Sequence, residues 1–287
     1  MRKTNNHTRI ELSRFVPPTG VCEYQAMIHI TSPELDFEQQ LAALLDACHH
    51  LRENELHGAR AVFERYFLSD AANQTQYLLD ALTACLACSR SIAEQPPLDG
   101  SKIALWVYLQ TEAVPQSFPG NQTGFVRNGY THLWTGYRYQ SGDTSEEQTR
   151  QLLNRYLQQL QETGGTLADN CVRTWFFVQN VDVNYAGVVK ARNEVFRTQR
   201  LTPDTHFIAS TGIGGRHAAP TVSVLMDDYS VLGISPEQIR YLYARTHLNP
   251  TYEYGVSFER GTCIDYGDRR HTFISGTASI DRRGQIV

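Results

Sequence analysis

The sequence predicts an α+β protein made of repeated units, in which mixed β-sheets carry their helices on one face. The main observation is that the same order of strands and amphipathic helices returns after about 110 residues, which is a signature of internal repeats. Each predicted helix has a single apolar stripe, so it must cover one face of a sheet. A dinucleotide-binding fold has little support, because no G-x-G-x-x-G motif opens a helix after a strand.

The first predicted unit spans residues 21–118. Phe37, Leu41 and Leu44 recur at helical spacing, whereas the aromatic-rich segment at 60–70 is typical of a strand. The expected elements are a strand at 22–30, a helix around 37–51, a strand at 60–70, a helix at 71–88 and a strand at 102–111. A loop at 95–100 separates the second helix from the last strand. Residues 1–20 are expected to be an N-terminal extension.

The second predicted unit spans residues 119–234 and follows the same order. Ser145 and Gln148 are interpreted as a capping box for its first helix, and Gly164 and Gly165 end that helix. The expected elements are a strand at 131–136, a helix with its apolar face at 152–160, a strand at 171–180, a helix around 185–196 and strands at 206–211 and 221–226.

A connector and the start of a third unit occupy residues 235–287. The segment 271–276 repeats the apolar pair, the hydroxyl residue and the glycine of 131–136, and Asp281 to Gly284 predicts a turn. A strand without its covering helix exposes an apolar face and an unpaired edge. We therefore expect this third unit to be incomplete, with about 90 further residues if the repeat continues.

Composition narrows the function classes. A net charge of −4 and a pI of about 6.2 give no support for nucleic acid or an anionic membrane as a partner. The N-terminus lacks the apolar stretch of a signal peptide and no segment has the length of a membrane span, so we expect a cytoplasmic protein. The lone Cys85-x-x-Cys88 pair lies in a predicted helix, and the Asp227-Asp228 pair is interpreted as an exposed strand end. No metal and no cofactor is therefore predicted.

Several motifs carry a family resemblance. The strand and helix at 171–196 resemble the core of the Rid (YjgF-like) superfamily, which has a chorismate-mutase-like fold. Gly276-Thr-Ala-Ser-Ile280, preceded by Ser275, resembles the S-G-T-A-S-I signature of the chorismatase family within it. Tyr254-Gly255 followed by Phe258-x-Arg260 resembles another segment of that family, and Thr211 to Gly215 falls at its glycine-bearing strand end. The resemblance covers roughly residues 130–287.

The resemblance implies an enzyme that cleaves the enol-pyruvyl ether of chorismate, releasing pyruvate and a cyclohexadiene or hydroxybenzoate acid. It assigns substrate binding to one set of residues: Tyr254, Arg260, Gly276, Thr277, Ala278 and Ser279. Arg260 suits a carboxylate and the small residues permit close approach. The acid of the family is a glutamate, expected beyond residue 287, so we predict that these residues alone are inactive. The spacing before Arg260 is shorter than in the family.

Two other functions remain open. Small Rid proteins are imine deaminases whose P-A-R-S arginine holds a carboxylate, but Thr205 stands at that position here. A non-catalytic ligand-binding or assembly protein is the second alternative. Because small Rid proteins are trimers, either a homo-oligomer or an internal pseudo-trimer is consistent with the repeats. Arg192 and Glu194 are expected to make surface or interface contacts, and His206, His217 and His271 to be structural.

Overall fold

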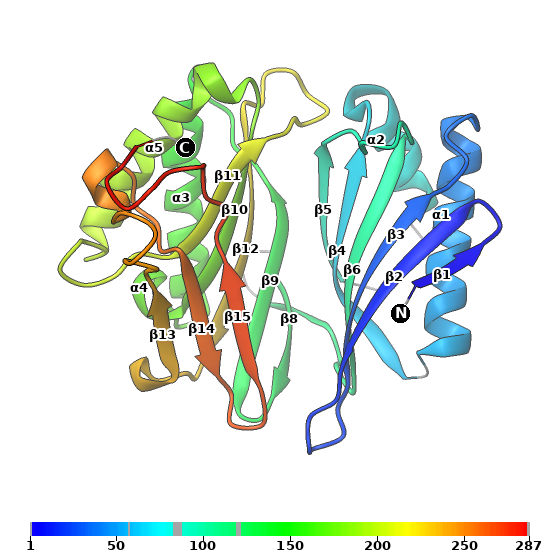
Figure 1. Cartoon of the computed structure of the whole chain (residues 1–287), viewed down its shortest axis with the longest axis horizontal. Coiled ribbons are helices and arrows are strands. Elements are labelled where there is room, and N and C mark those ends of the chain that lie inside the picture. The colour runs from blue at the N-terminus through cyan, green and yellow to red at the C-terminus, as the bar shows by residue number, and fades with distance from the viewer. Residues whose placement is uncertain (1, 57, 83–87, 119–121, 286–287) are drawn as a thin grey trace.

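Two six-stranded mixed sheets and one three-stranded sheet form the scaffold of the computed structural model, which describes residues 2–56, 58–82, 88–118 and 122–285. The two large sheets face each other, and their helices lie on the outer sides (Figure 1). No helix in these ranges is both long and apolar enough to cross a membrane. The predicted fold class, α+β with repeated units and helices on one face of mixed sheets, is confirmed.

The first sheet has the strand order β1-β2-β3-β6-β4-β5, with only the β4–β5 pair parallel. Its elements are β1 (Arg2–Asn5), β2 (Thr8–Phe15), β3 (Glu23–Ile30), α1 (Phe37–His50), a π-helical turn (Leu51–Glu55), β4 (Ala59–Leu68), α2 (Ala71–Ala81), β5 (Ser89–Glu94) and β6 (Ile103–Thr111). Apolar side chains of α1 and α2 pack with one face of this sheet.

The second sheet repeats this arrangement with the order β7-β8-β9-β12-β10-β11, and only β10–β11 is parallel. Its elements are β7 (Gln116–Phe118), β8 (Gln122–Arg127), β9 (Tyr130–Arg138), α3 (Ser145–Glu162), α4 (Leu167–Asn170), β10 (Cys171–Val178), α5 (Val181–Thr198), β11 (Ala209–Gly214) and β12 (Val224–Leu232). Each strand of this sheet therefore has a counterpart in the first.

The third sheet is an antiparallel meander that corresponds to the first three strands of each large unit. It consists of β13 (Ile239–Leu242), β14 (Gly261–Asp265) and β15 (Arg270–Ile274), and short 3-10 helices at Pro236–Gln238 and Thr251–Tyr254 accompany it. The strand predicted at 271–276 is thus β15, and the turn predicted at 281–284 is present, since Gly284 N–H donates to Asp281 O.

The structure corrects three local predictions. Residues 1–20 are not a separate extension, because β2 pairs along its whole length with β3. The second helix ends at Ala81 and β5 follows it, so the continuous helix predicted over 71–88 is wrong; Cys85 lies outside the described residues. The capping residue of α3 is Thr144, whereas Ser145 Oγ donates to Asn184 O.

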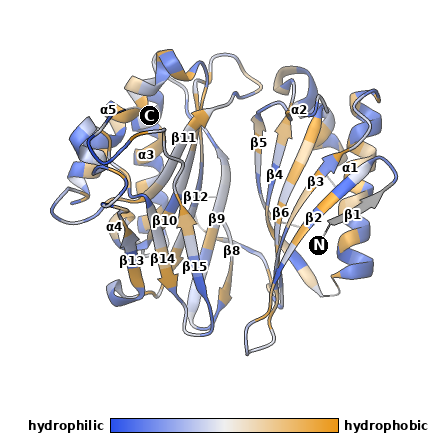
Figure 2. Ribbon diagram, in the orientation of Figure 1, coloured by the Kyte–Doolittle hydropathy of each residue, from blue (hydrophilic) through white to orange (hydrophobic). Residues whose placement is uncertain are grey.

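An aromatic layer fills the space between the inner faces of the two large sheets. Trp134 on β9 lies at its centre, with its ring centroid 5.1 Å from that of Phe63 on β4 and 4.3 Å from that of Tyr229 on β12. The third sheet adds Tyr266 and the partly buried Phe273 to the same cluster. Figure 2 shows apolar residues concentrated on the strands, as this double-sided burial requires.

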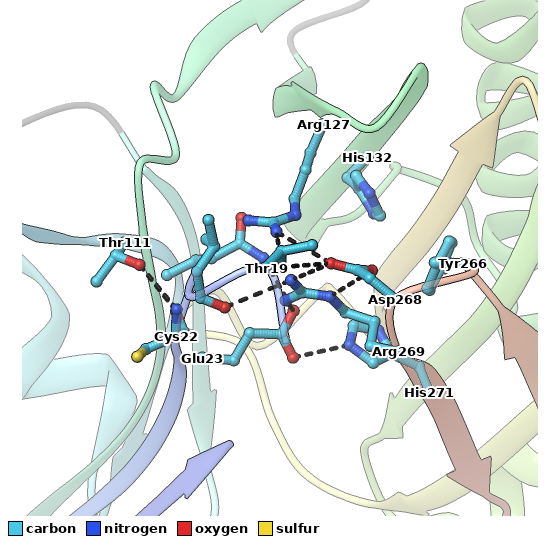
Figure 3. Close-up of polar contacts among 12 residues, drawn as sticks. Thr19, Cys22, Glu23, Thr111, Arg127, His132, Tyr266, Asp268, Arg269 and His271 are labelled. Carbon is cyan, nitrogen blue, oxygen red and sulfur yellow. Dashed lines mark hydrogen bonds and ion pairs between the residues drawn. The ribbon is translucent and has the colours of Figure 1, made fainter. Parts of the chain in front are cut away.

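A buried ionic network joins the three sheets at one end of this layer (Figure 3). Glu23 of β3 accepts a 2.6 Å hydrogen bond from Arg269 Nη1 and lies 2.9 Å from His271 Nε2. Arg269 also pairs with Asp268 at 2.9 Å, and Asp268 accepts from Arg127 of β8 at 3.2 Å. Separating the partners of a buried ion pair leaves an uncompensated charge, so the network opposes movement of the three sheets relative to one another.

This network and the adjacent His132 make stability depend on pH. Burial alone would raise the pKa of Glu23, but the hydrogen bond from His271 and the charges of His271 and Arg269 lower it to about 2. Burial, reinforced by the charge of His271, lowers the pKa of His132 from 6.5 to about 3. In both cases the unfolded chain binds the proton more readily, so acid favours unfolding.

We expect the free energy of unfolding to fall as pH decreases from 6.5, through His132, and to fall further below pH 4.5, through Glu23. The slope for one group is about 1.4 kcal/mol per pH unit. Urea titrations between pH 7 and pH 4 measure it. His132→Gln should flatten the curve above pH 4.5, whereas His49→Gln, at an exposed position, should not. An identical slope in wild type and His132→Gln contradicts the assignment.

Candidate functional site

Arg260 is the buried centre of the predicted substrate-binding set. It precedes β14 and is 6% exposed. Its Nη1 donates to Thr277 Oγ1 at 3.2 Å and its Nη2 to Asn249 O at 2.9 Å, and its guanidinium lies 5.7 Å from the ring centroid of Tyr254. Its Nε has no hydrogen-bond partner. The structure therefore brings Tyr254, Arg260 and Thr277 together.

Gly276 attaches the segment 276–280, which resembles the family signature, to the second unit. Its N–H donates to Thr211 Oγ1 at 2.8 Å, and a Cβ at this position would lie 2.7 Å from Thr211 Cγ2. A side chain would therefore displace the segment from β11. Ala278 and Ser279 follow as exposed loop residues. Of the six predicted residues, the contacts above bring four together: Tyr254, Arg260, Gly276 and Thr277. Ala278 and Ser279 lie near them only because they follow Thr277 in the chain.

Arg192 on α5 is a residue that sequence reasoning missed. It was expected at the surface, but it is 1% exposed, and its Nε and one Nη have no hydrogen-bond partner. Burial lowers the pKa of Arg192, and the neighbouring Tyr185 and Tyr254 oppose that shift. Glu194 behaves as predicted and makes a surface ion pair with Arg150. Arg192 lies three to four residues from Val188, Val195 and Phe196 on the buried face of α5, so helical spacing is the signal that could have indicated its burial.

Arg173 on β10 is a second buried arginine that was not predicted. It is 4% exposed and donates to Ser275 Oγ at 3.1 Å and to Thr211 Oγ1. Burial, together with the charge of Arg65, lowers the pKa of Arg173 to about 9. Arg173 thus contacts both segments that meet at Gly276: Ser275, which precedes Gly276 in the chain, and Thr211 of β11.

The three buried arginines share one property that bears on function. Within the described part of the chain, none of Arg173, Arg192 and Arg260 forms an ion pair with a carboxylate. A buried cation without a counter-ion is costly, and an anionic ligand removes that cost. Because guanidinium groups bind carboxylates through a planar fork of donors, the arrangement favours a small carboxylate ligand.

A cavity of about 240 Å³ lies against Arg260. Two of the lining residues, Arg260 and Asn249, each have a buried polar atom, Arg260 Nε and Asn249 Oδ1, with no hydrogen-bond partner among the described residues. Glu259 also lines it, and burial raises the pKa of this carboxyl, whose Oε1 accepts from Phe207 N–H. Gly276 to Ser279, to which the resemblance assigns substrate binding, are not among the residues that line this cavity.

The remaining polar candidates are structural. Asp227 and Asp228 are fully buried in β12 and not at an exposed strand end: Asp227 pairs with Arg65 at 2.7 Å, and Asp228 pairs with Arg138. His206 stacks on Tyr241 at 4.2 Å between centroids. In the described ranges, no three His, Cys, Asp or Glu residues gather as metal ligands.

Comparison with solved structures gives one extensive match. A crystal structure of chorismatase superimposes with a TM-score of 0.57 at 17% sequence identity, over 80% of this chain and 66% of that chain. The chain has a chorismatase-like fold. It spans about two thirds of the length of that chorismatase, and at this identity the match concerns the fold alone.

Smaller matches come from the YjgF family. A member from Mycobacterium tuberculosis is 25% identical with a TM-score of 0.29, over 34% of this chain and 77% of that chain. The YjgF gene product of E. coli is 19% identical with a TM-score of 0.32, over 38% and 85%. No family model and no curated protein matches the sequence. The fold that the resemblance implies is confirmed by the match to the chorismatase structure.

The close contact between Gly276 and Thr211 leads to a prediction about the stability of the fold. Gly276→Ala should lower the free energy of unfolding by about 1–3 kcal/mol, because the new methyl group meets Thr211, whose hydroxyl is already bonded to Gly276 N–H and Arg173. Gly214→Ala is the matched control, since a Cβ there has no neighbour within 4 Å. Urea denaturation compares the two; equal stabilities would show that the contact at Gly276 is not constrained.

Proposed function

We propose that this chain forms the chorismate-binding part of a chorismatase-like enzyme, which cleaves the enol-pyruvyl ether to release pyruvate and a cyclohexadiene or hydroxybenzoate acid. The observation that carries the proposal is the buried charge of Arg260 and Arg192, neither of which has a carboxylate partner among the described residues and both of which interact electrostatically with Tyr254. The chorismatase-like fold supports it.

The roles follow from the chemistry of the ligand. Chorismate carries two carboxylates, and Arg260, which lines the cavity, supplies a guanidinium for one of them. The Tyr254 side chain, which is 39% exposed beside Arg260, is placed to hydrogen-bond a carboxylate or the ring hydroxyl. Thr277 Oγ1 already bonds Arg260 and holds its guanidinium in orientation. Tyr254 and Arg260 therefore bind substrate, while Thr277 positions Arg260.

Cleavage needs an acid in addition to these binding groups. Protonation of the terminal carbon of the enol ether gives an oxocarbenium ion, to which water adds with loss of a proton before the hemiketal collapses to pyruvate and the dihydroxy-cyclohexadiene acid. Loss of one water from that diene would give the hydroxybenzoate. A carboxyl group with a raised pKa in a dry pocket is suited to that proton transfer. The proposal assigns this acid to a glutamate outside residues 1–287.

The two alternatives fit the site less well. At the position of the deaminase arginine, Thr205 Oγ1 donates to Arg200 O and closes a local loop, so no cation stands there. A non-catalytic carboxylate-binding protein uses the same arginines but no acid. The cytoplasmic location and the oligomeric state of this chain are predictions from its sequence.

Binding is tested by titration calorimetry of this chain with chorismate. We expect Arg260→Gln to weaken binding about 10- to 100-fold, because a charge-assisted hydrogen bond to the ligand contributes about 1.5–3 kcal/mol. Arg155→Gln on the exposed side of α3 removes the same charge and should leave the dissociation constant unchanged. Equal affinities of wild type and Arg260→Gln would rule out Arg260 as a ligand-binding residue.

Turnover is tested separately by measuring pyruvate with a coupled lactate dehydrogenase assay. We expect residues 1–287 to bind chorismate and to release no pyruvate above the buffer control, because the assigned acid is absent from them. Pyruvate release by this chain would place the acid within it. Binding without release even in a longer natural chain that carries a later glutamate would favour the non-catalytic alternative.

A further inference from the structure

The cavity on Arg260 also contains a buried carboxyl group that the proposed function does not use. Glu259, the neighbour of Arg260 in the chain, is 6% exposed and lines the same cavity of about 240 Å³. Its Oε1 accepts a 2.8 Å hydrogen bond from Phe207 N–H, and its own N–H donates to Ile208 O at 3.0 Å. These contacts fix Glu259 against the segment that leads into β11. The described residues give its Oε2 no hydrogen-bond donor.

Glu259 has no counter-ion, although two arginines line the same cavity. In the described part of the chain, neither Arg260 nor Arg245 forms an ion pair with it. Arg260 donates instead to a backbone carbonyl and a threonine hydroxyl, and the Arg245 guanidinium lies 4.8 Å from the ring centroid of Tyr243. Burial raises the pKa of Glu259, and its hydrogen bond and the two arginine charges oppose that shift only in part.

Two buried groups of opposite charge that do not pair with each other suit a ligand that carries both charges. A buried carboxylate without a cation is costly, and an ammonium group compensates it just as a carboxylate compensates a guanidinium. Asn249 also lines the cavity, and its buried Oδ1 is a second acceptor without a partner among the described residues. An ammonium group has three N–H donors and can use more than one acceptor. The exposed rings of Tyr243 and Tyr252 add apolar surface to the lining.

We propose that this cavity binds a free amino acid, with the ligand carboxylate on Arg260 and the ligand ammonium group on Glu259. An engineered cavity of about 150 Å³ admits a benzene molecule, so this larger one has room for an amino acid with a small apolar side chain. Because chorismate also needs Arg260, the amino acid competes with it for the site. The inference shares Arg260 with the proposed function but does not require chorismate to bind.

Titration calorimetry of the whole chain with L-leucine and with 6-aminohexanoate tests the proposal at two spacings between the ligand charges. We expect at least one of them to bind. Its analogues that lack one charge should bind at least 10-fold more weakly: 4-methylpentanoate and 3-methylbutylamine for leucine, hexanoate and pentylamine for 6-aminohexanoate. The bound amino acid should also raise the apparent dissociation constant of chorismate.

Glu259→Gln separates the two ligands. Glutamine keeps an acceptor for Phe207 N–H but has no charge, so the affinity for the amino acid should fall at least 10-fold. Chorismate carries no cation and should bind this variant as tightly as the wild type or more tightly. Arg260→Gln should weaken both ligands, and Glu38→Gln, at an exposed position of the first unit, should weaken neither.

Three results would overturn the proposal: no binding of either amino acid at high millimolar concentration, equal binding of the analogues, or an unchanged amino-acid affinity in Glu259→Gln. If Glu259→Gln does not fold, the comparison of each amino acid with its analogues on the wild-type chain still decides whether both charges are recognised. Binding of chorismate without an amino acid would remove this inference and keep the proposed function, whereas the reverse result would remove the proposed function and keep this inference.

Discussion

The need to bury both faces of two sheets governs the structure. Helices cover only the outer face of each large sheet, so the inner faces must cover each other, and the aromatic layer around Trp134 is the result. The third sheet enters this arrangement through Phe273 and Tyr266, which belong to the same cluster. Because interiors are close-packed, this layer fixes the distances between side chains that belong to different units.

Buried charges divide into two groups within that framework. Arg65, Arg138 and Arg269 are each paired with a buried carboxylate, as charges inside a protein usually are. Arg173, Arg192 and Arg260 have no such partner in the described part of the chain. The contrast matters because the arginines of both groups are largely buried, but only those of the first group have a carboxylate that balances their charge. A buried arginine without a counter-ion lowers the stability of the fold, and binding of a carboxylate ligand offsets that cost.

Sequence reasoning succeeded where the signal is periodic and failed where it is not. The helices α1, α3 and α5 were predicted from their apolar stripes, and the repeat predicted that β15 would correspond to β9. The strand Ser89–Glu94 was missed because four of its six residues are polar or charged and it follows a helix closely. The meeting of Arg260 with Thr277 was anticipated from the resemblance, but the burial of Arg173 depends on contacts between distant segments that no local pattern encodes. Arg192 lies on the apolar stripe of α5, where the helical spacing did indicate a buried position.

The pairing of Glu23 with Arg269 spans 246 positions of the chain and has a consequence for synthesis. Every strand of the first sheet has left the ribosome long before Arg269 is made. Until Arg269 is made Glu23 lacks this cation, and until β12 (Val224–Leu232) completes the second sheet the inner aromatic face of the first sheet lacks its full cover, a state that exposes apolar surface to neighbouring nascent chains. Slow codons or chaperone binding between the first and last units would therefore act on yield without altering any folded contact.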